Sequence, residues 1–204
     1  MLDQNINLII RPFANFTKRF LIMSVNLPQK IKIEKRKVKY LRIEVKLEGT
    51  KVILPEDQDF NLNEIFKKYE RWIKKKKENL KELKNLAKKV KLYYHESLEE
   101  EVKEFIEESS KILKTKPNIV IFRKMKRRWG SCDFQKKKII FNKDLKFLPT
   151  DLIKYVVFHE MSHLLIKNHK KEFWLLVKKL FPNYLQCEKL LSAYRIKLDL
   201  SNKK

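Results

Sequence analysis

Three of the four histidines in this 204-residue chain lie within eleven positions, at His159, His163 and His169. On an α-helix, residues four positions apart lie one above the other on the same face. If their segment is helical, the imidazoles of His159 and His163 can therefore both reach one metal ion at the usual zinc–nitrogen distance of about 2.0–2.1 Å. The chain must then leave this helix and turn back to bring a third ligand to the same ion.

The third ligand is expected a few residues further along the chain. His169 lies six residues after His163, far enough for a turn, and Asn168 suits the left-handed backbone that such a turn can need. Glu172 is a weaker alternative. The spacing matches that of metzincins, but Ile166 stands where those proteins keep a glycine, and no methionine follows for their Met-turn. The sequence therefore argues against a metzincin.

Glu160 supplies a candidate acid/base. It lies one residue after His159, about 100° round the helix, where its carboxylate addresses a metal-bound water rather than the metal. Such a carboxylate can take a proton from the water and pass it to a leaving group. Zinc lowers the pKa of its bound water towards about 7, so the pattern predicts a zinc-dependent hydrolase with Glu160 as the catalytic residue.

Two non-catalytic interpretations of the histidines are alternatives to a zinc-dependent hydrolase. In the first, the histidines only satisfy hydrogen bonds on a helix. In the second, the zinc is structural, although structural sites are closed by four ligands and commonly contain cysteine. Three histidines leave one coordination position open, which favours the catalytic reading.

Five other residues carry weaker predictions. Arg128, or its neighbour Arg127, is a candidate for stabilising an oxyanion, with a surface or phosphate-facing charge as the alternative. Tyr184 is a candidate hydrogen-bond donor to an intermediate, with a capping or core role as the alternative. Gly130 indicates a positive-φ turn or a close backbone approach. His95 is expected to be exposed at a helix end.

The charge balance is unusual. Lys and Arg number 49 against 25 acidic residues, which gives a net charge of +24. Such an excess attracts polyanions, so nucleic-acid association through a basic surface is one interpretation. The other is a chain whose solvated faces are simply rich in lysine, and we favour that reading for the segment from Lys67 to Lys91.

The compartment follows from what the chain lacks. No stretch of eighteen apolar residues is present, and the N-terminus has no apolar signal-peptide segment, so neither a transmembrane helix nor membrane association is expected. Cys132 and Cys187 form no metal-binding or disulfide pattern. We therefore expect a cytoplasmic protein; the sequence indicates nothing about its oligomeric state.

The hydrophobic periodicity predicts an α+β fold. Alternating residues at 31–34, 41–47 and 51–54 predict an N-terminal antiparallel sheet. A long Lys-rich helix is expected from Asn61 or Asn63 to about Tyr93. A second helix should follow the capping box of Ser97–Glu100. The elements expected after it are strands at 118–125 and 138–142 joined by a turn at 127–133, then helices at 149–164, 171–180 and 183–196.

This pattern divides the chain into four parts. Residues 1–24 are an extension of uncertain status, in which Met23 is an alternative start. The next parts are an N-terminal β region at 25–55, a helical segment at 56–116 and a zinc-binding catalytic core at 117–204. Residues 25–198 are expected to form one compact unit.

Several segments together resemble the YgjP-like metallopeptidase family, a zincin-type group related to the SprT-like proteins. They are Arg127–Cys132, Phe141–Asn142, Tyr155–His163, Asn168–His169 and Phe173–Trp174. The resemblance covers roughly residues 30–195. It implies a zincin-like core, in which the metal-binding helix packs on a small sheet, with zinc on the three histidines and Glu160 as acid/base.

The resulting hypotheses belong to three classes. The leading one is a zinc metallopeptidase that binds an extended segment of a peptide or protein substrate along a sheet edge. The second keeps the metal chemistry but acts on nucleotides as a phosphohydrolase. The third is a non-enzymatic nucleic-acid-binding protein with a structural zinc.

Overall fold

A computed structural model describes residues 6–10, 31–46 and 49–201. Its contacts divide the chain into two compact units, Asp3–Asn85 and Leu86–Lys204. The sequence predicted one unit over 25–198, and this was wrong because each unit has its own hydrophobic core. Of the expected extension at 1–24, only the strand at 6–10 lies within the described residues, and Met23 lies outside them.

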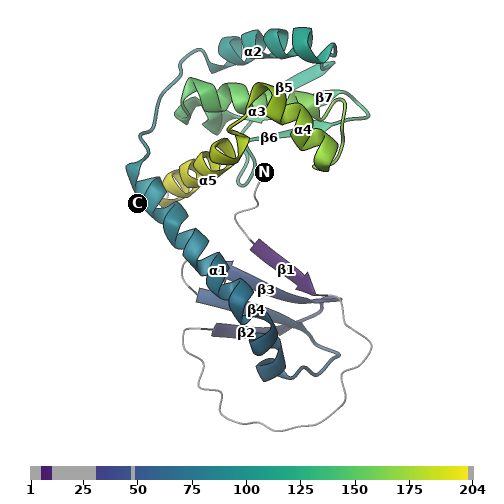
Figure 1. Ribbon diagram of the computed structural model, residues 1–204, viewed down its shortest axis with the longest axis vertical. Helices are drawn as coiled ribbons and strands as arrows, with labels where there is room; N and C mark the ends of the chain where they lie inside the picture. Colours follow the sequence, from purple (N-terminus) through teal and green to yellow (C-terminus); the bar gives the residue numbers. More distant parts are fainter. Residues whose placement is uncertain (1–5, 11–30, 47–48, 202–204) are drawn as a thin grey trace. The chain divides into compact units, whose positions relative to one another are not determined.

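The N-terminal unit contains a four-stranded sheet (Figure 1). Its strands are β1 (Ile6–Ile10), β2 (Ile31–Arg36), β3 (Leu41–Lys46) and β4 (Gly49–Pro55), in the order β1-β3-β4-β2. β3 is antiparallel to β1 and β4, whereas β2 is parallel to β4. The sheet is therefore mixed rather than wholly antiparallel, since β4 lies between β2 and β3 and runs in the direction of β2.

Helix α1 (Leu62–Lys89) covers one face of this sheet. Asn61 caps it, because its side-chain Oδ1 accepts hydrogen bonds from the backbone N–H groups of Asn63 and Glu64, at 3.1 and 3.4 Å. Apolar side chains on one face of the helix pack on the sheet. The buried contacts join Ile65, Ile73 and Leu80 of α1 to Leu41, Ile43, Val45, Val52 and Leu54 of the strands.

The C-terminal unit follows α1. Its elements are α2 (Leu98–Leu113), β5 (Ile119–Arg123), β6 (Gly130–Asp133), β7 (Lys138–Asn142), the 3-10 helix η1 (Lys143–Phe147), α3 (Thr150–Ser162), α4 (Lys171–Leu180) and α5 (Tyr184–Ser201). Strand β6 lies inside the segment predicted as a turn. The capping box was also wrong, because the Ser97 side chain makes no capping hydrogen bond.

The second sheet has the order β5-β7-β6, with β5 parallel and β6 antiparallel to β7. Strand β6 therefore forms one edge, and α3 contacts it there. Helix α3 is buried along nearly its whole length, with α2, α4 and α5 also in contact with it (Figure 1). The predicted α+β class, with the histidine-bearing helix packed on a small sheet, is confirmed. Among the described helices, none has the length and apolar character required to cross a membrane.

Candidate metal centre

Helix α3 carries two polar side chains into the interior of the C-terminal unit. His159 is 2% exposed and Glu160 is 3% exposed. Burying polar groups of this kind costs free energy unless they are hydrogen-bonded, paired or bound to a metal. Their neighbours on the helix are apolar and equally buried, so packing alone gives no reason for an imidazole and a carboxyl group at these two positions.

The three predicted histidines converge on one point. His169 Nε2 lies 3.0 Å from His159 Nε2 and 3.1 Å from His163 Nε2. Two nitrogens bound to one zinc ion can be at most about 4.2 Å apart, twice the bond length, so both separations fit a shared ion. All three ligand nitrogens lie within 4.8 Å of one another, and these residues form the one such cluster among the described residues.

The position of the proton on the His163 ring suits metal binding. His163 Nδ1 lies 3.0 Å from the Ile166 carbonyl oxygen, which can only accept a hydrogen bond. Nδ1 therefore carries the proton, and the lone pair of the neutral ring is on Nε2, which faces His169. This lone pair of His163 is therefore directed into the histidine cluster, where it can bind a cation.

Burial keeps the imidazoles neutral. It holds the pKa of His159 well below its ordinary value, and the neighbouring His163 and His169 lower it further. Burial also lowers the pKa of His163, although its hydrogen bond to Ile166 opposes the change. For His169, burial lowers the pKa to about 4. Neutral imidazole is the form that binds metals, so all three rings are ready to act as ligands at neutral pH.

The chain reaches His169 by a turn that differs from the prediction. Among the described non-glycine residues, positive φ occurs at Lys114 and Lys137 and not at Asn168. The Asn168 carbonyl instead accepts a hydrogen bond from the Lys170 N–H at 2.8 Å, which bends the chain without a left-handed residue. This turn brings His169 into the cluster, whereas the alternative ligand Glu172 is outside it.

Two aromatic rings of α4 hold the histidines. Phe173 stacks on His163 with centroids 4.4 Å apart, and Trp174 stacks on His169 at 5.4 Å. Tyr184, at the start of α5, stacks in turn on Trp174 at 4.9 Å. One ring, that of Trp174, therefore lies between Tyr184 and His169 in a short aromatic stack.

Glu160 points towards the start of strand β6. A Cβ atom added to Gly130 would lie 2.5 Å from Glu160 Cγ and 2.7 Å from its Oε1. Gly130 has no positive φ, so the close approach is what requires glycine here. Burial raises the pKa of Glu160 to about 8; the positive charge of Arg128 acts against this rise, and the negative charge of Glu188 adds to it.

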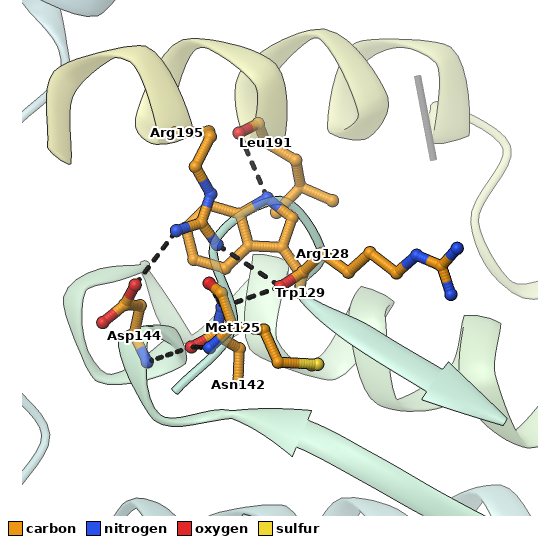
Figure 2. Close-up of polar contacts among 7 residues, drawn as sticks. All are labelled: Met125, Arg128, Trp129, Asn142, Asp144, Leu191 and Arg195. Atoms are coloured by element: carbon orange, nitrogen blue, oxygen red, sulfur yellow. Dashed lines mark hydrogen bonds and ion pairs between the residues drawn. The ribbon is translucent and has the colours of Figure 1, made fainter. Parts of the chain in front are cut away.

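The backbone before Gly130 is held by one asparagine (Figure 2). Asn142 is fully buried, and its Nδ2 donates hydrogen bonds to the carbonyl oxygens of Met125 and Arg128, each at 2.7 Å. Its Oδ1 accepts from the N–H groups of Met125 and Asp144, at 3.2 and 3.0 Å. All four hydrogen-bonding sites of the amide are used, which fixes the loop leading to Gly130.

A buried arginine supports the same loop from α5 (Figure 2). Arg195 is 3% exposed; its Nη1 donates to Asp144 Oδ2 at 3.0 Å and its Nη2 to the Arg128 carbonyl at 3.4 Å. The guanidinium lies 4.0 Å from the centroid of the Trp129 ring, and the Trp129 Nε1 donates to the Leu191 carbonyl at 3.2 Å. Sequence reasoning did not find Arg195 or Asp144, because they meet only in the folded chain.

Arg128 and His95 are the remaining residues singled out from the sequence. Arg128 contributes its carbonyl to the loop support, while its exposed guanidinium extends away from Asn142 and Arg195 (Figure 2). The positive charge of Arg128 nevertheless acts on Glu160, where it lowers the pKa of the carboxyl group. The expectation for His95 was wrong: its ring is largely buried, with Nδ1 2.9 Å from Glu101 Oε1 and Nε2 2.9 Å from the Leu148 carbonyl.

Comparisons with known proteins found one matching family model and several similar solved structures. The family model described as YgjP-like, metallopeptidase domain matches residues 78–194. A similar solved structure is the metallopeptidase zymogen of Pyrococcus abyssi abylysin, 24% identical, covering 48% of this chain and 95% of that chain with a TM-score of 0.42. Another is the metallopeptidase zymogen of Methanocaldococcus jannaschii jannalysin, 26% identical, covering 45% and 85% with a TM-score of 0.39. No curated protein matches the chain.

Proposed function

Because the chain belongs to the YgjP-like metallopeptidase family, we propose that it is a zinc-dependent peptidase in which Glu160 activates the attacking water. The observation that carries this proposal is the convergence of three imidazole Nε2 atoms next to a buried carboxyl group on the same helix. The family supports a metal-dependent peptidase, while zinc and the role of Glu160 rest on the chemistry of these residues.

The donor set favours zinc. Imidazole nitrogen suits zinc well, and three protein ligands with one open position are typical of catalytic rather than structural zinc sites. A bound zinc ion would supply a Lewis acid for the substrate carbonyl and lower the pKa of a water. Within the described residues no fourth ligand joins the cluster, which argues against the structural-zinc alternative.

Glu160 is suited to proton transfer. An acid/base catalyst works best when its pKa lies near the working pH, because it must both accept a proton and return it. Burial places the pKa of Glu160 at about 8, within reach of neutral pH. In the proposed reaction its carboxylate takes a proton from the attacking water and then delivers it to the leaving amine.

Substrate binding is proposed at the edge strand β6. This strand ends the sheet on the side of α3, and its first residue, Gly130, touches Glu160. An extended peptide can add to such an edge through backbone hydrogen bonds, which would carry a peptide bond towards the carboxyl group. Arg128 and Tyr184 remain the candidates for steadying the oxyanion, from the β6 and α5 sides respectively.

The proposal is tested on one preparation before and after metal removal. We expect casein cleavage to stop when a chelator removes the metal and to return when about one equivalent of zinc is added, while nucleotides release no phosphate. Zinc-dependent phosphate release without peptide cleavage would instead identify a phosphohydrolase. Zinc binding with salt-sensitive DNA binding and no hydrolysis would support the non-enzymatic alternative.

Gly130→Ala should slow hydrolysis without removing the metal. The added methyl group would overlap the Glu160 side chain and displace its carboxylate, and a misplacement of about 1 Å can cost about 100-fold in rate. The measurement is kcat together with zinc content. Ser131→Ala is the control, because neighbouring side chains on a strand point to opposite faces. A G130A protein with wild-type kcat would show that Glu160 does not need this position.

A further inference from the structure

The second nitrogen of each metal-binding imidazole usually donates a hydrogen bond that fixes the ring. For His163 this donation goes from Nδ1 to the Ile166 carbonyl. His159 differs: its Nδ1 is buried and has no hydrogen-bond partner among the described atoms. A buried polar nitrogen without a partner destabilises the folded chain, so its surroundings call for an explanation.

A carboxyl group faces this nitrogen. Glu188 of α5 is 5% exposed, and its Oε1 lies 4.0 Å from His159 Nδ1. At this distance the two groups do not form a hydrogen bond. The gap is about 1 Å longer than a hydrogen bond, and a small shift of either side chain would close it.

Glu188 is itself held in place by a second residue of α3. The Tyr155 hydroxyl donates to Glu188 Oε1 at 2.7 Å, and Tyr155 lies one helical turn before His159. Burial, together with the negative charge of Glu188, raises the pKa of Tyr155, so the hydroxyl keeps its proton and acts as the donor. Tyr155 and His159 thus present two donor groups from the same face of α3 to one carboxylate.

We propose that Glu188 is a positioning residue of the metal centre, whose carboxylate accepts the Nδ1 proton of His159 when the ion is bound. This hydrogen bond would keep the proton on Nδ1 and the lone pair on Nε2, the atom that faces His169. Tyr155 would act through Glu188 by fixing the carboxylate. The inference rests on the proposed metal site and adds to it a residue outside the three ligands.

The geometry separates this role from direct ligation. The two nitrogens of an imidazole lie on different sides of the ring, and the three histidines meet at their Nε2 atoms. Glu188 faces Nδ1 of His159, which is the other side. It is accordingly absent from the group of atoms that can hold the ion.

The test compares zinc affinity in three variants of the full chain. Glu188→Gln keeps the size of the side chain but removes its charge, and Tyr155→Phe removes the hydroxyl that anchors it. Glu172→Gln is the control, because it removes an exposed carboxylate of α4 that is outside the cluster. For each protein, the Kd for zinc is measured by competition with a chromophoric chelator, and the melting temperature is measured without metal.

We expect zinc affinity to fall about 10–100-fold in E188Q and several-fold in Y155F, as is typical when such a partner is removed, and to stay unchanged in E172Q. A purely structural role would lower the melting temperature of the metal-free protein but leave the Kd unchanged. Wild-type affinity in E188Q would therefore overturn the inference. If E188Q does not fold, wild-type affinity in Y155F overturns it instead. A wild-type chain that binds no zinc would contradict the proposed metal site rather than the role of Glu188.

Discussion

Glu160→Gln is expected to abolish most hydrolysis while the protein keeps its zinc. The amide has nearly the size of the carboxyl group, so it fits the space against Gly130, and it leaves all three histidines in place. It cannot take a proton from water, and general acid–base catalysis contributes about 10²–10⁴-fold to a rate. We therefore expect kcat to fall by that factor, measured on casein or a peptide, at wild-type zinc content.

His159→Ala is the matched control for this prediction. It removes one ligand and should lose both zinc and activity, so the pair of variants separates metal binding from proton transfer. Unchanged turnover in E160Q would rule out Glu160 as the catalytic base. Loss of zinc in E160Q would show that Glu160 supports the metal site itself.

Asp144→Ala is expected to cause the largest loss of stability. It leaves the buried guanidinium of Arg195 without its 3.0 Å partner, and breaking a buried ion pair from one side costs about 3–5 kcal/mol. For a unit of this size the melting temperature should fall on the order of 10–20 °C. Calorimetry or circular dichroism on the full chain measures the change.

An exposed ion pair provides the comparison. Lys116 and Glu107 lie 2.7 Å apart, but their side chains are 63% and 57% exposed, so Glu107→Ala should change stability by no more than about 0.5 kcal/mol. The double variant in which Asp144 becomes Leu and Arg195 becomes Met should recover most of the loss, since it leaves no buried charge. Equal effects of D144A and E107A would show that the buried pair does not support the fold.

The cluster of three histidines could be predicted from the sequence because its members are close together in the chain. His159 and His163 share one helical face, and His169 follows within a single turn of chain. The supporting residues could not be predicted in this way. Glu188 and Arg195 lie on α5, and they meet His159 and Asp144 only after the helices have packed. No sequence spacing therefore predicts these contacts.

The secondary-structure elements also differ in whether local patterns or contacts between distant segments determine them. Helix α1 and its asparagine cap could be predicted from the sequence because both follow from local patterns. Strand β6 was missed because Gly130–Asp133 has the residues of a turn, and it becomes a strand through pairing with β7. The parallel pairing of β2 with β4 likewise depends on contacts between segments, which alternation of side chains does not specify.

The position of β4 between β2 and β3 has a consequence for synthesis on the ribosome. Of the strands β2, β3 and β4, β2 emerges first, yet its neighbour in the described sheet is β4, which emerges last. β3 and β4 are adjacent in sequence and can pair as soon as β4 is available, whereas β2 must wait through β3 with its edge unmatched. The N-terminal sheet therefore cannot be completed in the order in which its strands leave the ribosome.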